Sequence, residues 1–284
     1  MNFYLSAFAD EYSPSLAGQI EGLNKHGIVF MEIRGVDGKN VAALTVEEAR
    51  EIRAKLDAGG VRVSSIGSPF GKIGIKDDFA PHLENMKRTM EVAHVLGTDK
   101  MRIFSFFMPK GEDPANYRSE VLDRMEQMLL AADKANIILC HENEKEIYGD
   151  SPERCLDINE YFANRIKLIF DPANFINCGY KPYEDGFSIL GDRIYYMHIK
   201  DASDGNTIVP AGCGVGRIPE ILAKLAEGNR DMYTTLEPHL KVFAGLKDLE
   251  NGENTTQIVD TYETSEDAFA AATNALKGII GNLK

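Results

Sequence analysis

Long apolar runs are missing from this sequence. No stretch approaches the roughly 20 apolar residues that a membrane-spanning helix needs, so we expect no membrane contact. The first residues, Met1 to Ser13, contain no basic segment and reach Asp10 and Glu11 before any apolar stretch of signal-peptide length. These absences predict a cytoplasmic protein.

Cysteines are few, and basic residues are the minority among the charges. The four cysteines form no C-x-x-C pair, which argues against a disulfide scaffold and predicts free thiols. Lys and Arg number 31 against 44 Asp and Glu, and the resulting formal charge of −13 repels a phosphate backbone. We therefore expect no nucleic-acid partner.

Short apolar or β-branched runs alternate with stretches of helical periodicity along the whole chain. Helices are expected near residues 15–26, 45–58, 80–96, 115–135, 152–163, 184–190, 217–227 and 265–280, and the sixth of these is short. The eight expected strands are Tyr4–Ala9, Val29–Arg34, Arg62–Ile66, Met101–Phe106, Ile137–Glu142, Lys167–Asp171, Tyr195–Lys200 and Tyr233–Glu237.

The number of βα units predicts a closed sheet. No strand is followed by G-x-G-x-x-G or by G-x-x-x-x-G-K-[ST], the phosphate-binding loops common in open parallel sheets. No linker rich in Pro, Gly or Ser divides the chain. We therefore predict an α/β protein with one domain over residues 1–284, a (β/α)8 TIM barrel.

Two loops deserve separate predictions. Gly212, Gly214 and Gly216 precede the seventh helix, where their N–H groups either bind an anion or form a turn close to the barrel mouth. The region from about Leu240 to Thr264 is polar and irregular, and it follows the last strand. It is expected to form a lid at the catalytic face.

Four expected strands end in an ionisable residue at the face where barrels of this kind carry their active sites. These residues are Glu142, Asp171, His198 and Glu237. Three converging carboxylates and an imidazole are costly to desolvate and repel one another, and a divalent cation removes that repulsion. The sequence therefore predicts one divalent metal ion, with Mn²⁺, Mg²⁺, Co²⁺ or Zn²⁺ compatible with the oxygen and nitrogen donors.

Several segments together resemble the xylose isomerase-like TIM barrel superfamily, the sugar phosphate isomerase/epimerase group. The resemblance rests on G-I-V-F-M-E-I-R-G around Glu32, H-E-N-E at 141–144, D-P-A-N at 171–174, H-I-K-D at 198–201, G-V-G-R-I-P at 214–219 and L-E-P-H at 236–239. It implies that Glu142, Asp171, His198 and Glu237 ligate one metal ion. It also implies that Glu142 and Glu237 exchange protons with a substrate carbon.

Further residues are candidates for substrate binding. Lys200 shares the inward strand face with His198, where it is expected to polarise a substrate oxygen or to hold a terminal phosphate or carboxylate of the substrate. The alternative is an ion pair with Asp201 or Glu220. Asn174 stands where several relatives have a substrate-binding histidine. Glu144 and His239 are candidates for the surroundings of the site, with solvated loop positions as their alternative. Glu32 and Arg34 share a face and are expected to form a structural ion pair below the site.

The resemblance implies a small carbohydrate substrate and an isomerase or epimerase that moves a proton at a carbon next to a carbonyl. A metal-dependent dehydratase of a keto-polyol such as an inosose remains an alternative, as does a non-catalytic sugar-binding barrel. The related endonucleases need several more histidines at strand ends than this chain offers. It has six histidines in total, three of them in predicted helices, and the acidic composition argues against DNA. Relatives often form dimers or tetramers, so a homo-oligomer is compatible with the resemblance.

Overall fold

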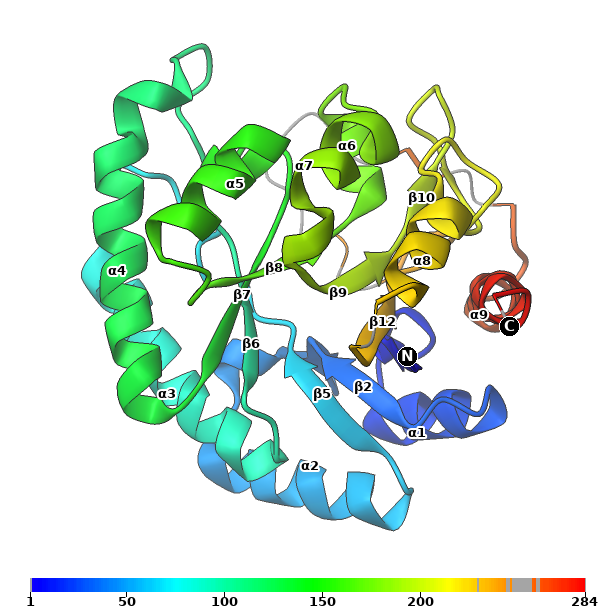
Figure 1. Cartoon of the computed structure of the whole chain (residues 1–284). Coiled ribbons are helices and arrows are strands. Elements are labelled where there is room, and N and C mark those ends of the chain that lie inside the picture. The colour runs from blue at the N-terminus through cyan, green and yellow to red at the C-terminus, as the bar shows by residue number, and fades with distance from the viewer. Residues whose placement is uncertain (1, 229, 244–245, 247–256, 259–260, 284) are drawn as a thin grey trace.

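The computed structural model describes residues 2–228, 230–243, 246, 257–258 and 261–283. Its parallel strands close into a barrel in the order β1-β12-β9-β8-β7-β6-β5-β2, with the first strand beside the last (Figure 1). The predicted (β/α)8 barrel is confirmed. The barrel strands are β1 (Phe3–Ala7), β2 (Phe30–Ile33), β5 (Arg62–Ile66), β6 (Lys100–Ile103), β7 (Ile138–Glu142), β8 (Lys167–Phe170), β9 (Ile194–Ile199) and β12 (Met232–Leu236).

Helices cover the outside of the barrel (Figure 1). The longer ones are α1 (Leu16–Lys25), α2 (Val46–Ala58), α3 (Phe79–Leu96), α4 (Arg118–Ala135), α5 (Pro152–Tyr161), α8 (Ile218–Ala226) and α9 (Ser265–Gly281). The sixth unit has short pieces instead, as its short periodic stretch predicts. They are α6 (Pro172–Asn177), the π-helical η5 (Pro182–Phe187) and α7 (Ser188–Leu190).

The loops contain several short elements. They are the 3-10 turns η1 (Ala9–Glu11), η2 (Val41–Ala43), η3 (Pro114–Tyr117), η4 (Tyr148–Asp150) and η6 (Gly191–Arg193), and the small antiparallel pairs β3 (Gly35–Val36) with β4 (Lys39–Asn40) and β10 (Asp201–Ala202) with β11 (Ile208–Val209). The second pair directly follows β9, so it lies where the predicted site residues are.

Local sequence explains where the helices begin and end. Thr45 and Glu48 form a capping box at the start of α2. Ser151 accepts a hydrogen bond from the Arg154 N–H at the start of α5, and Pro152 occupies the first turn, where no N–H is needed. These caps fix the residues at which the two helices begin.

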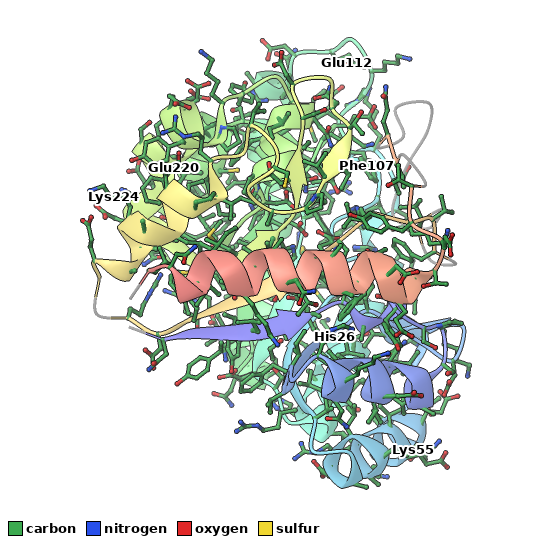
Figure 2. The ribbon with its side chains drawn as sticks, turned by 90° about the vertical axis from the view of Figure 1, so that its right-hand side faces the viewer. His26, Lys55, Phe107, Glu112, Glu220 and Lys224 are labelled. Atoms are coloured by element: carbon green, nitrogen blue, oxygen red, sulfur yellow. The ribbon has the colours of Figure 1, made fainter. Side chains whose placement is uncertain are left out.

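The last helix, α9, packs on the outside of the barrel beside the first helix, α1. Figure 2 shows α9 lying across the barrel next to α1, with His26 at the contact. The Phe269 ring of α9 packs edge to face on Tyr12, with ring centroids 5.5 Å apart. Lys277 of α9 donates a hydrogen bond to the His26 carbonyl oxygen. These contacts tie the C-terminal helix to the first βα unit.

Within the described residues, no helix is both long and apolar enough to cross a membrane. The lid expected at 240–264 lies largely outside the described residues, which include only 240–243, 246, 257–258 and 261–264 of that region. Leu240 and Phe243 are buried, so the beginning of this region packs against the molecule.

Candidate metal centre

The predicted ligands Glu142, Asp171, His198 and Glu237 all meet at the carboxyl end of the barrel. Their potential ligand atoms lie within 4.8 Å of one another, and all four side chains are buried. They come together because β7, β8, β9 and β12 are consecutive around the barrel and each of these strands ends at or beside one ligand. This grouping agrees with the arrangement expected from the strand ends.

His198 stands at the centre of the cluster. Its Nδ1 lies 2.8 Å from Glu142 Oε1 and 3.6 Å from Glu237 Oε2. Its Nε2 lies 3.2 Å from Glu32 Oε2, and Glu32 also accepts a hydrogen bond of 2.9 Å from the Tyr196 hydroxyl. A carboxylate behind the ring fixes the orientation of a histidine, as it does behind many metal-ligating histidines.

Two buried arginines hold the two glutamates, one arginine each. Arg102 Nη1 donates to Glu142 Oε2 at 3.1 Å, and Arg34 Nη1 donates to Glu237 Oε1 at 3.0 Å. The other oxygen of each carboxylate, Glu142 Oε1 and Glu237 Oε2, faces His198. Each glutamate therefore presents one oxygen to the cluster.

The expected ion pair between Glu32 and Arg34 is wrong. Arg34 instead donates to both oxygens of Asp10, at 2.8 and 2.9 Å, and to Glu11 at 3.1 Å. Its guanidinium lies between the rings of Phe8 and Phe243, 4.3 and 4.9 Å from the ring centroids. Strand alternation gives the face of a side chain but not its partner, and the first strand and its following turn supply carboxylates closer to Arg34 than Glu32 is.

Lys200 reaches the cluster directly. Its Nζ lies 3.0 Å from Asp171 Oδ2 and 3.1 Å from Glu237 Oε2. Lys200 does form ion pairs, but with Asp171 and Glu237, so the predicted alternative partners Asp201 and Glu220 are wrong. The ammonium lies beside two of the four predicted ligands and links them.

Asn174, Glu144 and His239 occupy different positions around the cluster. The Asn174 amide lies 3.4 Å from Glu142 Oε1 and donates to the Asn143 carbonyl oxygen at 2.9 Å. Glu144 forms an ion pair with Lys72 at 3.0 Å. His239 is buried, with its Nε2 3.6 Å from Glu237 Oε1, and neither of its ring nitrogens has a hydrogen-bond partner.

The glycine loop does bind an anion, and the anion is a side chain of the protein. The N–H groups of Gly212, Gly214 and Gly216 donate to the Asp201 carboxylate at 2.8, 3.1 and 2.9 Å. The Ala202 N–H adds a fourth hydrogen bond of 2.9 Å. The two predicted alternatives, an anion site and a turn near the barrel mouth, are thus each correct in part, because the bound Asp201 carboxylate fixes the turn.

The charged groups of the cluster shift one another's pKa values. Burial raises the pKa of Asp171 to about 7, against the opposing effect of Lys200. Burial also disfavours ionised Glu142, but the positive charges of His198 and Arg102 outweigh it and lower the pKa of Glu142. For His198, burial works toward a lower pKa, and the charges of Glu142 and Glu32 overcome it and raise the pKa to about 10. The glutamates are therefore held as carboxylates around a cationic centre.

The residues present fit a divalent cation. Six carboxylates, from Asp10, Glu11, Glu32, Glu142, Asp171 and Glu237, face only three permanent cations, from Arg34, Arg102 and Lys200. Asp171 Oδ2 is buried and receives no well-oriented hydrogen bond, although Lys200 is near. Three oxygen donors and one imidazole nitrogen suit a divalent metal ion, whose binding would displace the imidazole proton.

A second group of potential ligands, Glu11, Glu237 and His239, adjoins the first. Its geometry fits an additional ion poorly, because Arg34 already binds Oε1 of both glutamates. Of the two groups, the first is therefore the better candidate for a metal site.

Some residues of this site are absent from the sequence-based predictions. Arg102 is one, although a charged residue inside the apolar run Met101–Ile103 is a signal that the sequence contains. Asp10 and Glu11 are others, and they appear only as two charges near the N-terminus. They reach Arg34 because the barrel brings β1 beside β2, and a local sequence pattern does not predict which residues the barrel brings together.

Comparison with known proteins places the chain in a family. The sequence profile described as xylose isomerase-like TIM barrel matches residues 20–258. No curated protein sequence shows a significant match. The fold is similar to that of a D-allulose 3-epimerase from Methylomonas sp. (TM-score 0.74, 17% identity, 98% of each chain covered).

Two other solved structures share this fold. An IolI protein with a bound zinc atom has a TM-score of 0.73 and 14% identity over 99% of each chain. The probable 3-DHS dehydratase AsbF from Bacillus anthracis has a TM-score of 0.72 and 16% identity, covering 98% of this chain and 99% of its own. At these identities the likeness concerns the fold, whereas the profile match covers most of the chain. The chain therefore belongs to the xylose isomerase-like TIM barrel family.

Proposed function

We propose that this protein is a divalent-metal-dependent isomerase or epimerase of a sugar, sugar phosphate or polyol. The observation that carries the proposal is the pair Glu142 and Glu237, each held by an arginine through one oxygen and facing the same cluster with the other. Two carboxylates at one metal site supply the base and the acid that proton transfer at carbon requires. The whole chain, residues 1–284, is proposed to act as one domain.

The reaction starts at a carbon next to a carbonyl. One glutamate accepts the proton from that carbon, and the electron pair moves into an enediolate. A bound divalent cation supplies the positive charge that stabilises the developing oxyanion. The other glutamate, protonated at that stage, returns a proton to the opposite face of the carbon, which inverts its configuration.

Dehydration is the second candidate because Lys200 lies 3.1 Å from Glu237 Oε2. An ammonium at this position can protonate a hydroxyl group as it leaves the carbon beside the enediolate, which gives water and a C=C bond. Asn174 also lacks the imidazole that several epimerase-like relatives have at its position. The two candidates share the first proton transfer and differ in the second step.

The first test is metal content. Elemental analysis of the purified protein should give about one divalent ion per chain, and the His198→Ala variant should bind little. A wild-type protein that stays metal-free after incubation with Mn²⁺, Co²⁺ and Zn²⁺ would rule out this function and favour a sugar-binding barrel.

The second test follows the proton. Ketoses and inososes are incubated with the protein in deuterated water, and NMR detects exchange of the hydrogen next to the carbonyl. Epimers appear in the same spectra, whereas dehydration gives a new vinylic signal. We expect Glu142→Gln to lower the exchange rate at least about 10²-fold with an unchanged circular dichroism spectrum. Glu146→Gln is the control, because Glu146 is exposed. Wild-type exchange by Glu142→Gln would contradict the assigned base.

A further inference from the structure

The basic side chains that border the metal cluster are already bound to carboxylates. This holds for each of the four in the described part of the chain. Arg34 binds Asp10, Glu11 and Glu237, Arg102 binds Glu142, Lys200 lies between Asp171 and Glu237, and Lys72 pairs with Glu144. A phosphate or carboxylate group of a substrate would have to displace a protein carboxylate from one of these pairs, three of which are buried.

The backbone offers no alternative among the described loops at this face. The glycine loop has the series of N–H groups that often binds phosphate. Those of Gly212, Gly214 and Gly216 are directed to Asp201, which lies next to Lys200 in the chain. A substrate phosphate would therefore have to displace the Asp201 carboxylate from these N–H groups. Asp201 belongs to the same connection of the chain as the three glycines, so it is always present at the loop.

The charge balance opposes an anion as well. Seven carboxylates surround the cluster, those of the metal site together with Glu144, against four guanidinium or ammonium groups. Even with a divalent ion bound and His198 as a neutral ligand, the positive charges do not outnumber the acidic groups around the cluster. The whole chain carries a formal charge of −13, which adds repulsion at longer range.

Neutral hydroxyl groups, in contrast, find unused hydrogen-bonding atoms. Both ring nitrogens of His239 are buried without a hydrogen-bond partner. Its Nε2 lies 3.5 Å from Glu11 Oε1 and 3.6 Å from Glu237 Oε1, which is too far or too poorly oriented for a hydrogen bond. The ring stacks on Phe243 with centroids 5.4 Å apart. A hydroxyl group donates to an imidazole nitrogen or accepts from an imidazole N–H, so it satisfies either ring atom without adding charge.

We propose that the substrate is an uncharged polyhydroxy ketone that binds a hydroxyl group to His239, and that sugar phosphates and keto acids are excluded. This inference rests on the proposed function and narrows its substrate class. It concerns binding, so it can be tested without turnover.

The experiment compares matched ligands by calorimetry on the protein loaded with one equivalent of Mn²⁺. The pairs are D-fructose with D-fructose 6-phosphate and D-xylulose with D-xylulose 5-phosphate, and titrations into Mn²⁺ alone are subtracted because phosphates bind the ion. We expect at least one neutral ketose to bind at least about tenfold more tightly than its phosphate. Tighter binding of the phosphates, or binding of neither member of any pair, would overturn the proposal.

Variants at His239 test the hydroxyl contact. His239→Phe keeps a ring for Phe243 but removes both nitrogens, and His239→Gln keeps a hydrogen-bonding amide. Both replace a residue at φ 45°, so the backbone strain is common to them and cancels in the comparison. We expect His239→Phe to weaken binding of the neutral ketose about tenfold and His239→Gln to restore most of the loss. Equal losses in both variants would overturn the contact.

The two proposals fail in different ways. If a neutral ketose binds preferentially but shows no exchange of its hydrogen in deuterated water, the proposed isomerisation is wrong and the substrate class stands as a ligand class. If exchange occurs with phosphorylated ketoses instead, the proposed function stands and the substrate class is wrong.

Discussion

Glu142 and Glu237 are held alike, although they come from different strands. Each has one oxygen bound by a guanidinium, at 3.1 Å for Arg102 and 3.0 Å for Arg34. Arginine stays charged at all physiological pH values and binds a carboxylate in a fixed geometry. Each arginine therefore restricts its glutamate to one orientation and leaves a single oxygen for the cluster.

Lys200 is a buried cation between two of the proposed metal ligands, Asp171 and Glu237. We expect Lys200→Met to lower the free energy of unfolding of the metal-free protein by about 3 kcal/mol, because Asp171 and Glu237 lose a buried partner. Mn²⁺ should stabilise this variant more than it stabilises the wild type, because the carboxylates of Asp171 and Glu237 then have no ammonium group beside them and only the ion offsets their negative charge. Urea unfolding with and without Mn²⁺ measures both effects.

Lys100→Met is the matched control, because Lys100 pairs with Asp99 outside the cluster and is partly exposed. Its loss should cost less than about 1 kcal/mol and be independent of Mn²⁺. An equal response of the two variants to the ion would mean that Lys200 does not share the charge of the metal site.

His82 makes stability depend on pH. Burial, with a smaller contribution from Arg124, lowers its pKa from 6.5 to about 4, and its Nε2 accepts the Gly71 N–H at 2.8 Å only when deprotonated. The unfolded chain therefore binds this proton more readily, so the contribution of His82 is present above pH 6.5 and is lost as the pH falls toward 4. We expect the wild type to lose more stability than His82→Gln between pH 7 and pH 5 in urea unfolding. Identical losses would contradict the assigned titration.

At the scale of elements, hydrophobic runs were enough to predict the barrel. The predicted Arg62–Ile66 coincides with β5, and the other barrel strands begin and end near their predicted positions. The largest deviation is β6, predicted to reach Phe106 but ending at Ile103. The chain leaves the barrel there because Phe104 and Phe106 donate hydrogen bonds to Phe70 and Gly71 of the preceding loop. An apolar run does not distinguish a strand from such a buried loop.

The same limit explains which site residues were predicted. The four proposed ligands each follow an apolar run, so the sequence marks them. Glu32 lies within β2 and Arg34 directly follows this strand. Their partners, His198 and Glu237, are 166 and 203 residues away. Strand alternation gave their common face, and only the three-dimensional neighbours could give their partners.

The loop that binds the Asp201 carboxylate has no space for a side chain at Gly214. A Cβ atom at Gly214 would lie 2.2 Å from the Ala202 carbonyl oxygen and 2.3 Å from Asp201 Oδ1. We expect Gly214→Ala to lower the free energy of unfolding by about 2 kcal/mol and to weaken ligand binding, because the turn beside Lys200 must move. Gly205→Ala in the same connection is the control, as its Cβ would meet only Ser203 Oγ at 3.8 Å. Equal thermal unfolding of both variants would contradict this account of the loop.

At the scale of the whole molecule, barrel closure completes the site. Glu237 follows β12, Asp10 and Glu11 follow β1, and Arg34 follows β2, and these three strands are adjacent only because the last strand pairs with the first. The ion pairs of Arg34 thus join the first and last barrel strands at the carboxyl end of the barrel. Closure and assembly of the metal site are therefore coupled.

This coupling predicts that a bound metal ion stabilises the entire fold. An ion at 100 times its dissociation constant adds about 2.7 kcal/mol to the free energy of unfolding, which corresponds to a rise of about 5 °C or more in Tm for a protein of this size. We expect Mn²⁺ or Zn²⁺ to give this rise in thermal unfolding and a chelator to reverse it, whereas NaCl at equal ionic strength should not reproduce it. His198→Ala should lose the response, because its Nδ1 lies between Glu142 and Glu237. The same rise in His198→Ala would mean that the ions bind elsewhere on the acidic surface, and the link between the cluster and the stability of the barrel would be wrong.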